Sequence, residues 1–171
     1  MSKRKNPRPV SHRIYKLFWK IAWGVFCHLT PKPFNAWRLL VLRCFGCQVS
    51  GTPFVHQSVK IENPRNLKLE DRACIGANAV LYSLDRISIG KNSIVAQESY
   101  LCAGTHEFES GNFDLITKPI FVDENVFVGA RAFILPGITL GKGAIIGACS
   151  VVTKDVKGGE RVAGNPARNL S

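Results

Sequence analysis

His106 stands where a strongly apolar run ends and a polar segment begins, a setting suited to chemistry. The side chains that follow it include Glu107, Glu109 and Asp114. An imidazole titrates near neutral pH and can take the proton of a hydroxyl while that hydroxyl attacks a thioester. The negative oxygen of the tetrahedral intermediate then needs an N–H donor, which a backbone can supply. Acyl transfer with His106 as the base is one hypothesis, and a hydrogen bond from His106 that only holds the polar segment is the other.

The cysteines and the other histidines do not form a metal or redox pattern. Only Cys44 and Cys47 are close in sequence, and neither a second cysteine pair nor a His-x-His motif follows them. A three-histidine metal centre needs close histidine pairing, which none of the four histidines shows. We therefore expect no metal, and we expect the cysteines to be small buried side chains in a reducing compartment.

The element that must position His106 is a six-residue repeat. From residue 122 onward an aliphatic residue recurs at every sixth position, and the same ladder runs earlier in three triplets. Gly often follows the aliphatic residue, and small or β-branched residues recur four positions after it. The aliphatic positions are Val49, Val55, Ile61, Leu69, Ile75, Leu81, Ile89, Val95, Leu101, Val122, Val128, Ile134, Leu140, Ile146 and Val152.

A period of six fits neither an α-helix nor a long alternating strand, but it fits a solenoid with three short sides per coil. We predict an all-β fold, a parallel β-helix of about five coils with short N-terminal helices. Each side places one aliphatic residue inside, and Gly allows the backbone to turn at the corner. Two-residue insertions, Leu67-Lys68 and Ile87-Ser88, separate the early triplets and are short enough for a corner to absorb.

The ladder breaks once, between His106 and Val122. The segment 107–121 is polar and contains Gly111 and Pro119, so we predict an excursion loop that leaves a coil corner. Loops on a rigid scaffold are common sites of function, and the root of this loop is where we expect the site.

The positive charge is concentrated at the N-terminal end. The formal net charge is +11, and the first 45 residues hold ten Lys or Arg before the first acidic residue, Glu62. Ranges 11–29 and 34–45 read as two helices separated by Pro31 and Pro33. In the first helix, apolar residues recur at helical spacing: Ile14, Leu17, Phe18, Ile21, Val25 and Leu29.

We expect these helices to cap the open apolar end of the first coil. Peripheral membrane contact through residues 1–45 is a second hypothesis, because a basic segment rich in Trp and Phe suits an anionic lipid surface. No nucleic-acid recognition motif accompanies the charge, so we expect no nucleic-acid partner. Lys16 and Lys20 interrupt the apolar run that a signal peptide needs, and the apolar stretch 17–29 is shorter than the roughly 20 residues of a spanning helix.

We therefore expect a cytoplasmic protein, with the inner face of the membrane as the place of any lipid contact. The chain divides into a basic helical segment at 1–47, a β-helix domain at 48–160 that includes loop 107–121, and a C-terminal tail at 161–171.

Several stretches resemble the hexapeptide-repeat acyltransferases, over about residues 34 to 170. The run from Ile89 to His106, IGKNSIVAQESYLCAGTH, is similar to the run that ends at the catalytic His of maltose and galactoside acetyltransferases. PGITLG at 136–141, VVTKD at 151–155 and AGNPA at 163–167 are similar as well. LYS at 81–83, THEF at 105–108 and FDLITKPI at 113–120 are closer to the colanic-acid-type acetyltransferases of exopolysaccharide assembly.

The resemblance implies a left-handed winding and a homotrimer with active sites between neighbouring β-helices. It implies an O-acetyltransferase that moves an acetyl group from acetyl-CoA to a saccharide hydroxyl, with His106 as general base. An amino sugar or another small acceptor, a longer acyl donor, and a non-catalytic β-helix scaffold stay open as alternatives.

The resemblance also implies which residues contact the two substrates. Phe127 stands where the family usually has Trp, and Ala130 where galactoside enzymes have Ser. Lys154 and Arg168 suit the phosphates of CoA, although either could be a solvated surface charge. The residues that match the CoA-contact positions are Phe127, Ala130, Ala148, Thr153, Lys154 and Arg168. The candidates near the acceptor are Tyr82, Ser83 and Asp85, with Glu107, Glu109 and Asp114 to orient the imidazole or touch the sugar.

Overall fold

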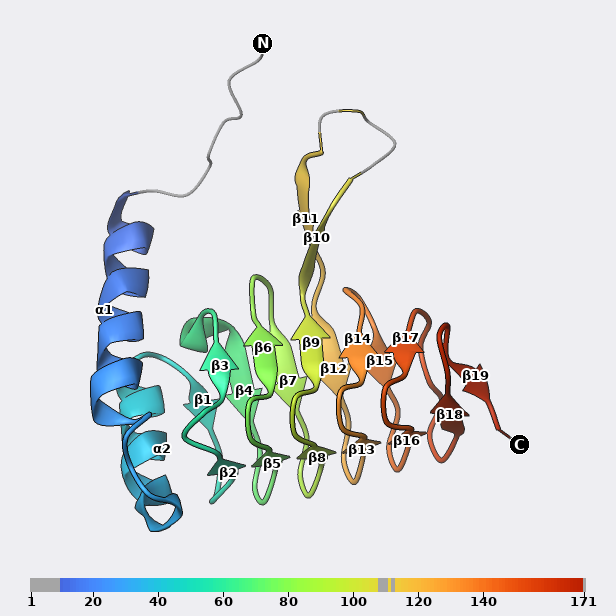
Figure 1. Ribbon diagram of the computed structural model, residues 1–171, viewed down its shortest axis with the longest axis horizontal. Coiled ribbons are helices and arrows are strands. Elements are labelled where there is room, and N and C mark those ends of the chain that lie inside the picture. Colours follow the sequence, from blue (N-terminus) through green and yellow to red (C-terminus); the bar gives the residue numbers. More distant parts are fainter. Residues whose placement is uncertain (1–9, 108–110, 112, 171) are drawn as a thin grey trace.

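The computed structural model describes residues 10–107, 111 and 113–170, and it shows a parallel β-helix with two helices across its N-terminal end (Figure 1). Each face of the β-helix is a sheet of short strands, in which strands of successive coils pair in parallel. The first face contains β1 (Gln48–Val49), β4 (Leu67–Leu69), β7 (Ile87–Ile89), β12 (Ile120–Val122) and β15 (Thr139–Leu140). The third face contains β3 (Lys60–Ile61), β6 (Val80–Tyr82), β9 (Tyr100–Cys102), β14 (Phe133–Ile134) and β17 (Val151–Val152).

The second face is longer than the other two. It contains β2 (Phe54–Val55), β5 (Cys74–Ile75), β8 (Ile94–Val95), β13 (Phe127–Val128), β16 (Ile145–Ile146) and β18 (Arg161–Ala163). A last strand, β19 (Arg168–Asn169), pairs with β18 in the antiparallel direction. The structure therefore has five complete coils and begins a sixth, whereas the repeat predicted about five. The sixth coil was missed because Val162, its aliphatic residue six positions after Val156, lies in the segment 161–171 that we predicted to be a C-terminal tail.

The aliphatic ladder forms the core. Of the fifteen predicted inward positions, fourteen are buried and Val49, in the first coil, is half-buried. The extra residues Leu67 and Ile87 are also buried and stack in register with Ile120. The two-residue insertions therefore lengthen strands β4 and β7 and add a second inward row, rather than widening a corner.

The glycines that follow the aliphatic residues have a different role from the one we predicted. The left-handed backbone positions lie three residues after the aliphatic residue, and non-glycine residues such as Asn78, Asn92 and Arg131 occupy them with φ near +60°. Gly76 is instead required by close stacking, because an added Cβ would lie 2.7 Å from the backbone N of Gln97 in the next coil. A glycine directly after the aliphatic residue therefore allows adjacent coils to stack closely, and the chain turns two residues later, at the left-handed position.

Two helices cover the first coil, α1 (Val10–Phe26) and α2 (Asn35–Cys44), with a 3-10 turn η1 (Lys32–Phe34) between them. A second 3-10 turn, η2 (Pro64–Asn66), lies at a corner. Trp19 and Trp23 are buried against the coil, and their indole N–H groups donate to the carbonyls of Ile61 and Val59. The predicted cap is therefore present. On α1 the tryptophans make the contact and not the aliphatic residues, and α2 adds buried Leu39, Val41 and Leu42.

Arg38 of α2 is fully buried, a feature that the sequence did not suggest. Its guanidinium donates to the carbonyls of Val55, Pro31 and Lys32 and to the Thr30 hydroxyl. These bonds fasten the inter-helix turn and α2 to strand β2. Burial lowers the pKa of Arg38 from its ordinary value, because it desolvates the guanidinium.

The cysteines are free, but they are not all buried as expected. Cys27 and Cys47 are buried, Cys74 and Cys102 are half-buried, and Cys44 and Cys149 are exposed. Cys149 is exposed because it occupies a left-handed corner position, where the side chain points out of the coil.

Candidate active site at the hairpin corner

The predicted excursion is an antiparallel hairpin that projects from the middle of the β-helix (Figure 1). Its strands are β10 (Gly104–His106) and β11 (Leu115–Thr117), and His106 pairs with Leu115. The chain rejoins the first face at β12. The hairpin leaves the corner tightly, since a Cβ on Gly104 would lie 2.7 Å from the Leu84 side chain.

His106 is exposed on β10, and its ring is oriented by the hairpin itself. The Nδ1 atom lies 2.7 Å from the carbonyl oxygen of Phe113. A carbonyl can only accept, so Nδ1 donates the proton of this bond, and in the neutral ring Nε2 keeps its lone pair. Phe113 holds its carbonyl there from a left-handed backbone conformation with φ of 51°. Sequence reasoning looked for a carboxylate to orient the imidazole and missed this carbonyl, because a backbone acceptor leaves no sequence signal.

The same hairpin positions the carboxylates that were predicted near His106. Glu107 contacts Asp114 through the backbone, where the Glu107 N–H donates to the Asp114 carbonyl at 2.9 Å. The Asp114 side chain is exposed and the Glu107 side chain is half-buried. Glu109 lies outside the described residues. The hairpin thus brings Glu107 and Asp114 to the root of the loop beside His106.

The corner that bears His106 also carries the predicted acceptor residues. Leu81 and Leu101 stack in register, so Tyr82 and Ser83 precede His106 by one coil on the same edge. Tyr82 is half-buried and pairs with Cys102. Ser83 is fully buried, and its hydroxyl both accepts from the Asn63 N–H and donates to the Asn63 carbonyl. Asp85 is half-buried and accepts the N–H of Arg86.

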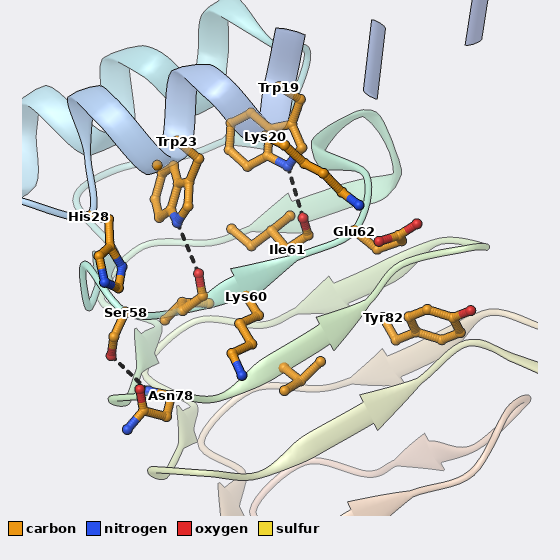
Figure 2. A pocket seen from close by; sticks show the side chains of 13 residues that line it. Trp19, Lys20, Trp23, His28, Ser58, Lys60, Ile61, Glu62, Asn78 and Tyr82 are labelled. Atoms are coloured by element: carbon orange, nitrogen blue, oxygen red, sulfur yellow. Dashed lines mark hydrogen bonds between the residues drawn. The ribbon is translucent and has the colours of Figure 1, made fainter. Parts of the chain in front are cut away.

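Tyr82 also lies at the rim of a cavity of about 410 Å³ between α1 and the third face (Figure 2). Buried Trp19 and Trp23 form its back, and the polar side chains around it include Lys20, Lys60 and Glu62. The cavity was not predicted, since it depends on how α1 crosses strands β3 and β6.

Three of the predicted CoA-contact residues lie together two coils beyond His106. Thr153, Lys154 and Arg168 line a hollow of about 310 Å³ beside β17, with Asp155 and Glu160 among the other lining residues. Thr153 and Lys154 follow β17 on the same corner as His106, because Leu101, Ile134 and Val152 stack in register. The side chains of Lys154 and Arg168 are both exposed.

The other three predicted CoA-contact residues, Phe127, Ala130 and Ala148, lie on a different part of the β-helix. Phe127 points outward from the second face, and Ala130 and Ala148 lie at the corner between the second and third faces, where Cys149 N–H donates to the Ala130 carbonyl. One whole face separates this corner from that of His106. A single chain therefore does not bring the six residues to one place.

Family comparisons agree with this architecture. Residues 67–103 match the family described as hexapeptide repeat of succinyl-transferase, and residues 119–154 match bacterial transferase hexapeptide (six repeats). The chain is 36% identical over 152 residues to the putative colanic acid biosynthesis acetyltransferase WcaF of Escherichia coli strain K12, covering 89% of this chain and 83% of that protein. The chain belongs to the hexapeptide-repeat acetyltransferases.

Solved structures of hexapeptide-repeat acetyltransferases have the same fold. One is the acetyltransferase of Vibrio cholerae O1 biovar eltor complexed with acetyl coenzyme A, with a TM-score of 0.85, 22% identity, and coverage of 100% of this chain and 92% of that chain. Another is a maltose O-acetyltransferase from Clostridium difficile 630, with a TM-score of 0.82, 24% identity, and coverage of 95% and 88%. These matches confirm the predicted fold class.

The hexapeptide-repeat prediction did not include a row of outward aromatic rings on the third face. Tyr100 stacks on Phe133 with ring centroids 4.9 Å apart, and Tyr82 lies 6.1 Å from Tyr100. Burial raises the pKa of the Tyr100 hydroxyl, which therefore stays neutral. Tyr100 and Phe133 are 33 residues apart, across the break in the ladder, so a search at period six does not relate them. Within the described residues, no group of three or more His, Cys, Asp or Glu side chains could hold a metal ion.

Proposed function

We propose that this acetyltransferase moves an acetyl group from acetyl-CoA to a hydroxyl of a saccharide, with His106 as general base. The observation that carries the proposal is the bond from His106 Nδ1 to the Phe113 carbonyl. It holds the neutral ring in the tautomer whose Nε2 can accept a proton, and it leaves the ring exposed toward a substrate.

The reaction follows from that tautomer. Nε2 takes the hydroxyl proton as the acceptor oxygen attacks the thioester carbonyl carbon, and a tetrahedral intermediate forms. The C–S bond then breaks, and the imidazolium returns its proton to the leaving CoA sulfur. The Phe113 carbonyl stabilises the imidazolium through the Nδ1 proton, while a coil N–H would stabilise the oxyanion.

The donor would lie along the last coils. Lys154 and Arg168 are exposed cations at one hollow and suit the CoA phosphates, with Thr153 beside them. Phe127, Ala130 and Ala148 would pack against the rest of CoA from another chain. The separation of the two sets within one chain favours a homotrimer with each site between neighbouring β-helices.

Tyr82 and Asp85, with Glu107 and Asp114, are the proposed acceptor contacts. Ser83 would support them through Asn63, because its hydroxyl is already engaged. The relative named for colanic acid biosynthesis supports an exopolysaccharide or lipid-linked sugar as the acceptor class.

Within the described residues, no helix has the length and apolar character to cross a membrane. Peripheral contact of residues 1–45 with the inner face of the membrane is the part of the proposal that would bring the enzyme to such an acceptor.

The first test is His106→Ala, with His12→Ala on α1 as the matched control. We expect His106→Ala to lower the rate of CoA thiol release with a panel of saccharide acceptors by about 10³-fold, because general base catalysis is lost. Acetyl-CoA binding by calorimetry and the circular dichroism spectrum should stay as in the wild type. Near wild-type turnover would contradict the base assignment, and no acetyl-CoA binding by the wild type would favour a scaffold.

The second test concerns the shared site. Lys154→Ala/Arg168→Ala should weaken acetyl-CoA binding about tenfold or more, whereas Lys91→Ala, on another corner, should not. Co-expression of this variant with Phe127→Ala/Ala148→Trp should restore activity, because mixed trimers would contain some sites with neither defect. Failure to restore activity would place both residue sets of a site on one chain.

A further inference from the structure

The outer side of α1 carries an apolar stripe that faces away from the rest of the protein. We define the outer stripe as Val10, Ile14, Leu17, Phe18, Ile21 and Val25, all of which are 50% to 70% exposed. At about 100° per residue they lie on the side of α1 opposite Trp19 and Trp23. The two tryptophans already fill the contact with the coil, as their bonds to Ile61 and Val59 show (Figure 2).

The apolar surface continues from α1 onto α2. Phe26 and Leu40 are about half exposed, and between the helices runs a groove lined only by Ala22, Phe26, Trp37, Leu40, Val41, Cys44 and Phe45. Trp37 is 42% exposed, and its N–H donates to the Phe26 carbonyl, so its ring edge is held in the groove. An exposed apolar area of this extent is unusual for a surface that contacts only water.

The charge around this surface is of one sign. The first 45 residues contain ten Lys or Arg and no Asp or Glu. Six of the ten lie in the described residues. Lys16 pairs with Glu62 and Arg38 is buried, while the other four, Arg13, Lys20, Lys32 and Arg43, are exposed. Arg13 borders the outer stripe on the helix wheel and is exposed.

We propose that the outer stripe and the groove beside it dock on the surface of an anionic phospholipid bilayer. The helix lies in the interface with its apolar side in the acyl boundary, since no helix of the described residues is long and apolar enough to cross. A second copy of the chain is a poorer occupant, because the two basic segments would face each other. Membrane docking itself does not depend on the proposed function. Its consequence, that the active site works close to a lipid-linked acceptor, rests on the proposed function.

The position of α1 supports a lipid surface over a neighbouring subunit. The helices lie across the N-terminal end of the β-helix, whereas the hairpin and the coil faces lie along its sides (Figure 1). Side-by-side packing in the proposed trimer would use the sides and leave the three caps at one common end. Three outer stripes would then meet one bilayer together, and their binding would be multivalent.

The experiment is vesicle flotation of the full chain with vesicles of phosphatidylglycerol and phosphatidylethanolamine, against phosphatidylcholine alone. We expect at least tenfold stronger binding to the anionic vesicles, reduced by added salt. Leu17→Gln/Ile21→Gln/Val25→Gln should lower the binding at least tenfold, since all three side chains belong to the outer stripe and are more than half exposed. Leu170→Gln, which removes an exposed leucine at the opposite end, is the control and should bind as the wild type does.

Two further measurements keep the outcomes distinct. His106→Ala should float as the wild type does, and the triple variant should keep its activity on a water-soluble saccharide, so failure of the docking proposal is separate from failure of the proposed reaction. Equal flotation of the triple variant and the wild type would overturn the inference. A change in oligomer mass of the triple variant, without vesicle binding by the wild type, would also overturn it and identify the stripe as a protein interface.

Discussion

The coils and the helical cap both bury apolar surface, but in opposite ways. In the coils, each six-residue unit buries one aliphatic side chain, so stability is spread over many equivalent contributions. In the cap, a few large residues carry the contact, and Trp19, Trp23 and Arg38 each donate to a coil carbonyl. The periodic apolar side chains point into the core in the coils and toward solvent on α1. The same sequence signal therefore marks a core in one region and an exposed surface in the other.

The sharpest test of this contrast is one substitution made in both regions. Leu69→Ala, in the fully buried ladder, should lower the free energy of unfolding by about 3 to 4 kcal/mol through lost burial and a residual cavity. Leu17→Ala, at a leucine that is 60% exposed, should change it by less than about 0.5 kcal/mol. Denaturant unfolding at one fixed protein concentration measures both. Equal losses would show that α1 buries its aliphatic side in solution.

A second test removes the polar anchor of the cap. Arg38→Met should lower the free energy of unfolding by about 2 to 3 kcal/mol, because four acceptors around a buried guanidinium lose their donors. Arg43→Met, at an exposed arginine of the same helix, is the matched control and should have an effect below about 0.5 kcal/mol. An equal effect of both variants would mean that the buried bonds of Arg38 contribute nothing specific.

A third test compares two glycines. Gly76→Ala should lower the free energy of unfolding by about 1 to 2 kcal/mol, because the new Cβ meets the backbone of the next coil. Gly24→Ala in α1 should raise it by about 0.5 to 1 kcal/mol, because nothing lies within 4 Å and Ala favours a helix. Thermal unfolding of the two variants should therefore shift in opposite directions. A stabilised Gly76→Ala would contradict the role of glycine in coil spacing.

The smallest effect concerns thiol chemistry, which should follow burial and not sequence spacing. Burial raises the pKa of Cys27 to about 11 and that of Cys47 to about 12. At pH 8 the thiolate fraction is then roughly one in a thousand for Cys27 and lower for Cys47, so both should resist alkylation. The exposed Cys44 and Cys149 should react first in a timed iodoacetamide reaction read by peptide mass. Early labelling of Cys27 would contradict the packed cap.

The coils were predictable because each one repeats the same physical requirement. An inward aliphatic every six residues leaves little choice of fold, and the position of the hairpin followed from the one break in the ladder. Arg38 and the Phe113 carbonyl were not predictable, and the sequence left open whether the apolar side of α1 packs on the coil or is exposed. Each depends on where a non-repeating segment meets a distant part of the chain, and no local pattern encodes that contact.

The features of the candidate site also divide into those that the sequence period can predict and those that require the structure. His106 and Lys154 lie on one edge in the structure, a result that counting coils from the period alone could have given. The separation of Ala130 and Ala148 from that edge also follows from the period, but its meaning depends on how chains assemble. The tautomer of His106 required the structure, because it is fixed by a main-chain oxygen.

The two ends of the β-helix limit how far it can grow. A stack of parallel coils exposes unpaired N–H and C=O groups at each end, and such edges can recruit another chain. Here helices α1 and α2 cover one end, and at the other β19 turns back against β18 and presents Arg168 and Asn169. The same arginine that is proposed to hold a CoA phosphate thus belongs to a terminator strand, which would keep the protein from polymerising end to end into a fibre.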